Sequence, residues 1–346
     1  MSIVGGLDVH RKQITFDYLD TASGVVERGQ ILAADRRQLA RWLGRFDGRD
    51  DVAFAAEACT GWRYVIEELQ RAGVVAHLAD PAETAAARGR KRRAKTDRTD
   101  ARLIRTLLTE ERLPECYIPP TQVLEYRALL ELYHDLRREH TAWVQRIHAV
   151  LFHQGAEHLG AGGVSTVEGR QRLVEVAAGQ LSPAGQIQIA TGIEMLEATE
   201  RHLEQIRRQL LGIARHVRGA KTLADALYGV GPITALALTC WLGGAGRFSS
   251  SRKAVRFVGL DVTVYSSAGK RSPGHLSRQG PAVLRWCLYE AGKTHALGRA
   301  EDHDYYARVK DRIDGKRAAL SEARKIVRRA SHILTDLGED AFARVT

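Results

Sequence analysis

Residues 3–19, IVGGLDVHRKQITFDYL, decide the fold of the amino-terminal region. The apolar run at residues 3–9 contains one charged residue, Asp8. After a short polar turn, residues 13–19 alternate apolar and polar side chains, as a half-buried strand does. Residues 25–33 predict a third strand. Three consecutive strands predict a meander at the start of the chain.

The following residues alternate between helix and strand signals. Asp35 precedes an amphipathic segment in the position of a helix cap. Residues 51–58 predict a strand, residues 61–72 a helix and residues 74–78 a strand. This order predicts a mixed sheet that carries helices. After Pro81 the chain becomes very basic, and residues 96–112 predict another helix.

The composition predicts a globular protein with a polyanionic partner. The chain has 346 residues, 44% of them hydrophobic and 27% charged, which is enough for two or three domains with real cores. The 52 Lys and Arg exceed the 41 Asp and Glu, so the net charge is +11, and such an excess favours binding to phosphate backbones.

Neither membrane insertion nor secretion is expected. The longest apolar stretch, residues 233–242, is about half the length that spans a bilayer. The first ten residues lack the basic start and the long apolar core of a secretory signal. We therefore expect a cytoplasmic protein with no membrane partner.

The cysteines and histidines give little evidence about function. The four cysteines are far apart and form no CxxC pair, so they predict buried thiols rather than a zinc site or disulfides: Cys59, Cys116, Cys240 and Cys287. His10 lies two residues after Asp8 and could sit near a metal, but a surface position is the favoured interpretation.

The middle of the chain predicts long helices. After Pro119 and Pro120, residues 122–152 read as one helix, and a second helix is expected to begin near Gly192. The second has apolar residues at heptad spacing, which indicates an antiparallel helical pair or an oligomerising coiled coil. Two helices that pack within one monomer explain the pattern equally well. Residues 155–183 are expected to form a loop with one short helix.

The region from Lys221 onward predicts a compact, basic and mainly helical unit. Gly229, Gly231 and Pro232 resemble the turn of a helix-hairpin-helix, whose backbone amides can hold a phosphate. Residues 247–285 contain eight basic residues and one acidic residue. A solvated face usually mixes its signs, so this segment is expected to face nucleic acid.

Four carboxylates indicate metal-dependent phosphoryl transfer. Asp8 and Glu57 lie at the ends of predicted strands, and Asp97 and Asp100 are three residues apart on one helix face. Hard oxygen ligands that converge at a sheet end suit Mg²⁺, and two such ions can stabilise both oxygens of an in-line displacement. Taken singly, each has a structural alternative: Asp8 as a turn residue, Asp97 as a helix cap and Asp100 as surface decoration.

Residues 264–285, VYSSAGKRSPGHLSRQGPAVLR, combine hydroxyls, glycines and cations. A serine nucleophile that attacks a phosphodiester needs close backbone approach and nearby cations, and Ser266 or Ser267 beside Lys270 and Arg271 meets that need. Serines in such a loop are more often phosphate contacts than nucleophiles. The chain has no GxSxG motif, so acyl transfer has no support.

Together these motifs resemble a known family. GLDVHRKQ, AFAAEACTGW and KTDRTDARLI resemble the DEDD tetrad of insertion-sequence transposases that have an RuvC-like amino-terminal domain. GVGPITALALTCWLG and FVGLDVTVYSSAGKRSPGHLSRQGPAVLRWCL resemble their carboxy-terminal serine domain. This is the insertion-sequence family numbered one hundred and ten, whose better-studied members are bridge-RNA-guided DNA recombinases.

The resemblance implies a fold in three parts. It implies an α/β ribonuclease H-like domain at 1–115, a helical coiled-coil spacer at 120–217, and a mainly α serine-bearing domain with a helix-hairpin-helix-like segment at 220–346. The spacer would mediate assembly into a dimer or tetramer, and the two halves of an active site would come from different protomers.

It also implies a mechanism. Asp8, Glu57, Asp97 and Asp100 would bind Mg²⁺, with Mn²⁺ as an alternative, and Ser267, with Ser266 as its rival, would form a covalent phosphoserine link to DNA. The partners would be the element ends, the target DNA and a noncoding bridge RNA, with action at the nucleoid. The residues expected to hold nucleic acid are basic: Arg88, Arg90, Lys91, Arg92, Arg93, Lys95, Lys270, Arg271 and Arg278.

Three alternatives stay open at this point. A junction nuclease on the same fold would use the carboxylates and water, without a covalent intermediate. A nucleotide-binding protein of the actin type also opens with three strands and an Asp, but it would want Gly-rich phosphate loops where this chain has His10, Arg11 and Lys12. A non-catalytic scaffold would bind RNA or DNA by charge alone.

Overall fold

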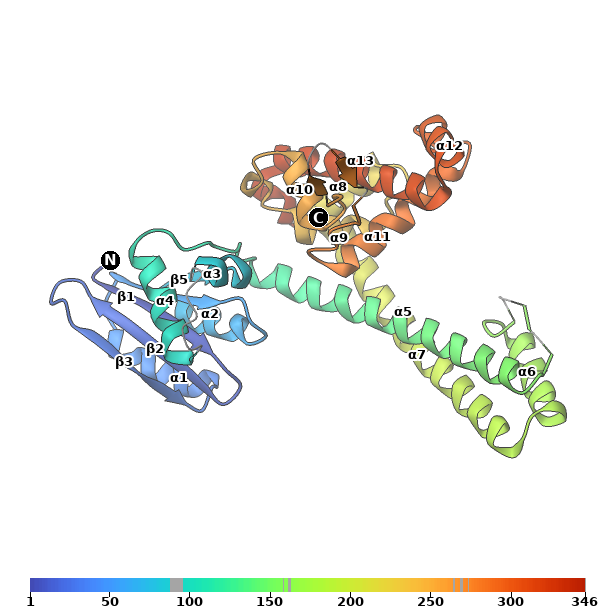
Figure 1. Ribbon diagram of the computed structural model, residues 1–346, viewed down its shortest axis with the longest axis horizontal. Helices are drawn as coiled ribbons and strands as arrows, with labels where there is room; N and C mark the ends of the chain where they lie inside the picture. The colour runs from blue at the N-terminus through green and yellow to red at the C-terminus, as the bar shows by residue number, and fades with distance from the viewer. Residues whose placement is uncertain are drawn as a thin grey trace. The chain divides into compact units, whose positions relative to one another are not determined.

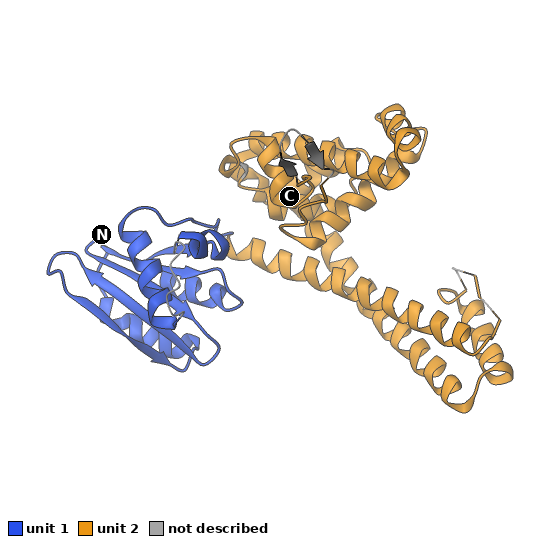
Figure 2. Cartoon of the chain, in the orientation of Figure 1, with its two compact units in different colours: residues 1–119 blue, residues 120–346 orange. Residues whose placement is uncertain are grey.

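The computed structural model describes residues 1–87, 96–157, 159–160, 163–263, 265–267, 270–272 and 274–345. It divides the chain into two compact units, residues 1–119 and residues 120–346 (Figure 2). The basic run at 88–95 lies outside the described residues. The first unit contains a mixed α/β sheet and the second is mainly helical, as the sequence predicts. Within the described residues, no helix is both long enough and apolar enough to cross a membrane.

The first unit is built on a five-stranded sheet in the order β3-β2-β1-β4-β5. The first three strands form the predicted antiparallel meander, and β4 and β5 run parallel to β1. The bounds agree with the predicted strands: β1 Ile3–Val9, β2 Gln13–Asp20, β3 Val26–Leu32, β4 Val52–Glu57 and β5 Val75–Ala79.

One face of this sheet carries the hydrophobic core. Helices α1 (Arg36–Leu43) and α2 (Trp62–Arg71) pack there, and the one-turn 3-10 helix η1 (Gly44–Phe46) follows α1. Leu7, Phe16 and Phe54 are buried against Trp42 of α1, and the aromatic rings lie within contact distance. Asp35 caps α1 by accepting a hydrogen bond from the Gln38 backbone N–H, as predicted.

The opposite face carries helix α4 (Asp97–Thr109), which follows the short helix α3 (Pro81–Ala87). Thr96 and Thr99 form a reciprocal capping box at its start, which fixes where the helix begins. Its backbone lies directly on Gly6 of β1, because a Cβ at Gly6 would be 2.2 Å from the Ala101 carbonyl oxygen. Only glycine permits this close approach.

The second unit begins with two long helices, α5 (Thr121–His153) and α7 (Pro183–His216), with α6 (Val167–Gln180) between them (Figure 1). The start of α5 shares a core with the end of α7, and the end of α5 shares one with the start of α7, so the pair is antiparallel.

The start of α7 corrects the sequence prediction. The helix begins at Pro183, where Ser182 caps it, and not near Gly192. Gly192 instead marks a tight contact within the pair, since a Cβ there would be 2.8 Å from the Ile147 side chain. The glycine thus marks a site of close helix packing. Residues 155–183 contain one short helix, α6 Val167–Gln180, as predicted.

Helices α8 to α11, α13 and η4 share one core, whereas α12 packs on the start of α13 in a separate hydrophobic cluster. Helices α8 and α9 are joined by the predicted Gly-Val-Gly turn, where Gly229 has a φ of 76°. A two-stranded hairpin, which the sequence analysis took for a loop, lies between α10 and α11. The elements are α8 Arg218–Ala226, α9 Pro232–Leu242, η2 Ala245–Arg247, α10 Ser251–Val258, β6 Tyr265–Ser267, β7 Lys270–Ser272, α11 Ala282–Lys293, η3 Thr294–Ala296, α12 His303–Arg312, α13 Gly315–Leu337 and η4 Gly338–Phe342.

Candidate active site

The register of the sheet places two predicted carboxylates side by side. Leu7 of β1 pairs with Ala56 of β4 in parallel, so Asp8 and Glu57 each follow that pair by one residue. Side chains alternate along a strand, and Asp8 therefore lies on the face of Gly6, which α4 covers. The same alternation places Glu57 on that face. Both carboxylates thus belong to the α4 side of the sheet and not to its aromatic core.

Helix α4 brings the other two carboxylates to this end of the sheet. Asp97 and Asp100 lie in its first turn, and the next turn contacts Gly6. Asp100 is buried, with 6% of its surface exposed, and Asp8 is similarly buried at 7%. The Asp97 side chain is more open, at 42%. The close packing on Gly6 thus determines how α4 presents its carboxylates to Asp8.

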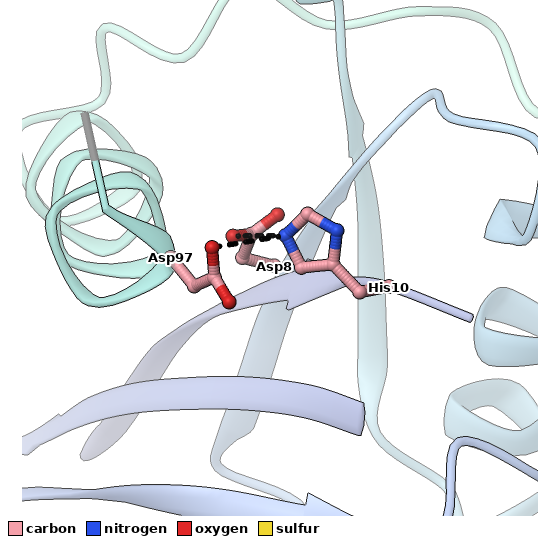
Figure 3. A group of neighbouring side chains, drawn as sticks. All are labelled: Asp8, His10 and Asp97. Carbon is pink, nitrogen blue, oxygen red and sulfur yellow. Dashed lines mark hydrogen bonds and ion pairs between the residues drawn. The ribbon is translucent and has the colours of Figure 1, made fainter. Parts of the chain in front are cut away.

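His10 contacts two of the carboxylates, Asp8 and Asp97, through one ring nitrogen (Figure 3). Its Nε2 is 3.1 Å from Asp8 Oδ2 and 3.3 Å from Asp97 Oδ1. Gln13 donates a hydrogen bond from Nε2 to the other oxygen of Asp97, at 3.0 Å. His10 was expected at the surface. It directly follows β1, and its ring contacts both Asp8 and Asp97.

The electrostatics of the group favour a bound cation. Burial raises the pKa of Asp8, His10 opposes that shift, and the nearby Asp100 and Asp97 raise the pKa further. The carboxylates therefore repel one another, and a cation among them would relieve the repulsion. The ligand atoms of Asp8, His10 and Asp97 lie within 4.8 Å of one another. This donor set, mainly hard oxygen and partly open to solvent, fits a divalent ion.

Glu57 lies outside this close group of three. It ends β4 and is half-buried. It is level with Asp8 on the neighbouring strand and is the fourth carboxylate at the same end of the sheet. Of the four carboxylates predicted from the sequence, Asp8 and Asp97 both contact His10. The charge of Asp100 raises the pKa of Asp8, and Glu57 lies beside them on the neighbouring strand.

A buried ion-pair network, not foreseen from the sequence, supports α4 one turn below the carboxylates. Asp17 of β2 is 2% exposed and pairs with Arg105 of α4, which is itself 9% exposed. Arg28 of β3 contacts the other oxygen of Asp17 at 2.7 Å. Asp17 of β2 pairs with Gly6 of β1 in the sheet register. The ion pairs therefore bind α4 to the sheet next to Gly6, where the helix backbone comes closest. A single Asp in an alternating strand gives no signal of such a partner.

The serine segment forms a hairpin in the second unit. Ser267 at the end of β6 pairs with Lys270 of β7, and Ser266 pairs with Arg271. The description of these residues is limited to their backbone. Below the hairpin, the Thr263 backbone N–H donates to the His275 carbonyl oxygen at 2.9 Å, which continues the pairing toward the base.

The base of the hairpin is held by close backbone packing. A Cβ at Gly259 would be 2.0 Å from the Gln279 carbonyl oxygen, and a Cβ at Gly280 would be 2.0 Å from that of Phe257. Both glycines have φ near +75°. Arg278, one of the predicted nucleic-acid contacts, is exposed between them with a φ of 53°. These two glycines therefore allow the chain segments that flank the hairpin to approach each other closely.

A second group of titratable residues lies inside the carboxy-terminal bundle. His295 and Glu322 are buried, and burial lowers the pKa of His295 and raises that of Glu322. Lys325 Nζ lies 3.3 Å from both Glu322 Oε1 and Asp302 Oδ1, and Arg329 contacts Asp302 at 2.8 Å. Two cations thus pair with the two carboxylates, and one ligand atom each from His295, Asp302 and Glu322 lies within 4.8 Å of the others.

Sequence comparisons match both units. The profile of a transposase family, described as "Transposase", with the designation DEDD_Tnp_IS110, matches residues 5–153. A second, described as "Transposase IS116/IS110/IS902 family", matches residues 221–307.

Two curated proteins are similar over most of their length. One, from Pseudomonas aeruginosa and named "Probable family 20 transposase", is 24% identical over 294 residues, which cover 83% of this chain and 82% of that protein. The other, the transposase y4rJ of Sinorhizobium fredii, is 28% identical over 328 residues, which cover 84% of this chain and 79% of that protein. The two matched ranges, residues 5–153 and 221–307, contain the four predicted carboxylates and both candidate serines.

Proposed function

The chain belongs to the IS110 family of DNA transposases, and we propose that it breaks and rejoins DNA strands with a carboxylate-bound divalent ion and a serine nucleophile. The observation that carries the proposal is the convergence of Asp8, Asp97 and Asp100 at the end of a parallel strand pair, beside Glu57. Transposition implies DNA as the substrate, and the net charge of +11 suits that polyanion.

The four carboxylates would hold Mg²⁺, with Mn²⁺ as the alternative. When bound, the ion would supply charge stabilisation for the phosphoryl oxygens that react. The chain's own residues make that binding favourable. Burial of Asp8 and Asp100 keeps bulk water away, while the openness of Asp97 leaves room for a phosphate of the DNA backbone. The Asp17–Arg105 pair and the contact of α4 on Gly6 hold the ligands in register.

Ser267 is the proposed nucleophile, with Ser266 as its rival. Its Oγ would form a bond to a DNA phosphorus while the bond to one deoxyribose oxygen breaks. The serine proton is lost and the leaving oxygen gains a proton, so charge balances. The phosphoserine ester keeps the phosphate activated, and a hydroxyl group of another DNA end can then displace the serine. Lys270 and Arg271, opposite the serines in the hairpin, would offset the charge that develops on phosphorus.

The remaining parts of the proposal concern nucleic acid and assembly. We propose that Arg88, Arg90, Lys91, Arg92, Arg93 and Lys95, together with Lys270, Arg271 and Arg278, hold the element ends and target DNA. The antiparallel α5–α7 pair would serve as a coiled-coil spacer that joins protomers into a dimer or tetramer. The α8–α9 turn would contact phosphate as a helix-hairpin-helix does. A bridge RNA as guide, and action at the nucleoid in the cytoplasm, complete the proposal.

The test is covalent capture of DNA. Purified protein is incubated with a divalent ion, RNA transcribed from the flanking noncoding region, and DNA that carries the element's ends. We expect a protein–DNA adduct that survives denaturant and is absent in Ser267→Ala and in Asp8→Ala, while Ser266→Ala retains it. Metal-dependent cleavage without an adduct, unchanged in Ser267→Ala, would contradict the serine mechanism and indicate a junction nuclease that uses water.

A further inference from the structure

We infer that His10 is a direct ligand of the divalent ion and that it biases the site toward ions that accept nitrogen, such as Mn²⁺, over Mg²⁺. This inference rests on the proposed function, because it concerns the same carboxylate site. It goes further in assigning a nitrogen ligand, and with it a metal preference, to a group otherwise made of oxygens.

The first argument comes from distances. Adjacent ligand atoms around an octahedral ion with bonds of about 2.1 Å lie about 3.0 Å apart. Nε2 of His10 lies 3.1 Å from Asp8 Oδ2 and 3.3 Å from Asp97 Oδ1 (Figure 3). All three atoms lie within 4.8 Å of one another. The two distances from Nε2 are therefore close to those between neighbouring ligands of one ion.

The second argument comes from hydrogen-bonding capacity. His10 Nε2 is within hydrogen-bond distance of Asp8 Oδ2, at 3.1 Å, and lies 3.3 Å from a second carboxylate oxygen, Asp97 Oδ1. If Nε2 instead carries its lone pair, that lone pair faces two negative oxygens, which is unfavourable unless a cation lies among the three. Metal-binding histidines use this lone pair. An ion among the three atoms would thus use the Nε2 lone pair and relieve its contact with the two negative oxygens.

The third argument comes from the supports of the three ligands. His10 and Asp8 lie on one face of the same chain segment, two residues apart. Gln13 donates to Asp97 Oδ2 at 3.0 Å, which leaves Asp97 Oδ1 toward His10. Partners that orient metal ligands in this way commonly accompany real sites. The His10 side chain is also 50% exposed, so water and a phosphate can still reach the ion.

The metal preference follows from the ligand type. Mg²⁺ prefers oxygen ligands and keeps most of its waters. Imidazole is a typical ligand of first-row transition metals; Mn²⁺ is the weakest binder of that series and, like Mg²⁺, is well served by carboxylates and water. Replacing one oxygen ligand with His10 therefore strengthens Mn²⁺ binding more than Mg²⁺ binding. The other ligands, all carboxylates, serve both ions alike.

The experiment uses Mn²⁺ as a spectroscopic probe in the full chain. Pulsed electron paramagnetic resonance detects the coupling of bound Mn²⁺ to a coordinating imidazole nitrogen, and titration gives the affinities for Mn²⁺ and Mg²⁺. The variants are His10→Gln, which offers an oxygen in place of nitrogen, and Asp8→Asn, which tests the site itself. His77→Gln is the matched control, because His77 also contacts a carboxylate, Glu115, at 3.0 Å in the same unit but lies on β5.

We expect the nitrogen coupling in the wild type and in His77→Gln and not in His10→Gln. Loss of His10 should weaken Mn²⁺ binding by about 10- to 100-fold, the range typical of changes around metal ligands, and weaken Mg²⁺ binding less. Mn²⁺ binding that depends on Asp8 but shows no nitrogen coupling, or an unchanged Mn²⁺ to Mg²⁺ preference in His10→Gln, would overturn the inference and leave the carboxylate site intact. Absence of Asp8-dependent binding would overturn the proposed metal site as well.

Discussion

Replacing Gly6 with alanine should separate the alignment of the carboxylates from the stability of the fold. A Cβ at Gly6 would lie 2.2 Å from the Ala101 carbonyl oxygen and 2.6 Å from the Arg105 nitrogen. Both are backbone atoms of α4, so no side chain can turn aside. Ordinary contact would require α4 to move away from the sheet by about 1 Å.

That displacement should cost activity more than stability. Overpacking of this kind typically lowers the free energy of unfolding by about 1–3 kcal/mol. A misplacement of about 1 Å between reacting groups can cost about 100-fold in rate. Because α4 carries Asp97 and Asp100, we expect Gly6→Ala to lose roughly that factor in metal-dependent strand cleavage, together with a weakened affinity for Mn²⁺.

The neighbouring residue offers a matched control. Gly5 lies on the opposite face, where a Cβ would be 2.0 Å from the ring of the buried Phe54. Gly5→Ala should therefore also destabilise the unit, but through the aromatic core and without moving α4. Urea unfolding followed by circular dichroism gives the two stability losses, and cleavage is compared at a temperature where both variants are folded. Equal activity of the two folded variants would refute the reasoning.

Three further outcomes follow from the contacts. Asp17→Asn should lower the free energy of unfolding by about 3–5 kcal/mol because it leaves the buried Arg105 unpaired. The Arg28 side chain is 53% exposed, so Arg28→Gln should lower it by only about 0–1 kcal/mol. Similar losses for the two variants in urea unfolding would contradict the account. Gln13→Met should weaken Mn²⁺ binding by about 10-fold through the freed Asp97, with calorimetric titration as the measurement and an unchanged affinity as the opposing result. Burial lowers the pKa of His295. As the pH falls from about 7.5 through about 6.5, the unfolded chain therefore takes up a proton that the folded chain does not. The free energy of unfolding should decrease with falling pH, and it should decrease less steeply in His295→Gln; parallel pH profiles of the two proteins would rule this out.

The fold of the first unit could be predicted closely because its signals are local. The alternation in residues 13–19 and the cap at Asp35 each act within a few residues of their own position. At α4 the cap is Thr96 and not Asp97, the structural alternative considered for that carboxylate. The second unit was harder where the signal depends on packing. Gly192 suggests a helix start in the sequence, but it is the point where α7 meets Ile147 of α5, and nothing nearby in the sequence announces that contact.

In the candidate site, too, local features could be predicted from the sequence, and contacts between distant residues could not. The carboxylates were identified because Asp, Glu and a helix spacing of three have a direct chemical meaning. Their supports were not, since Asp17 and Arg105 are 88 residues apart and only the fold joins them. His10 was expected at the surface, and it is indeed half exposed, but its ring also contacts Asp8 and Asp97. Partial exposure and participation in a site are compatible at an open metal centre.

The most direct test of the serine mechanism is to identify the residue that carries the DNA. The covalent adduct from wild-type protein is digested with protease and nuclease, and the peptide that retains a nucleotide is sequenced by mass spectrometry. The account predicts a nucleotide on Ser267, within the β6–β7 hairpin, and only when a divalent ion and an intact Asp8 are present. Attachment at another residue, or cleaved DNA with no modified peptide, would contradict it.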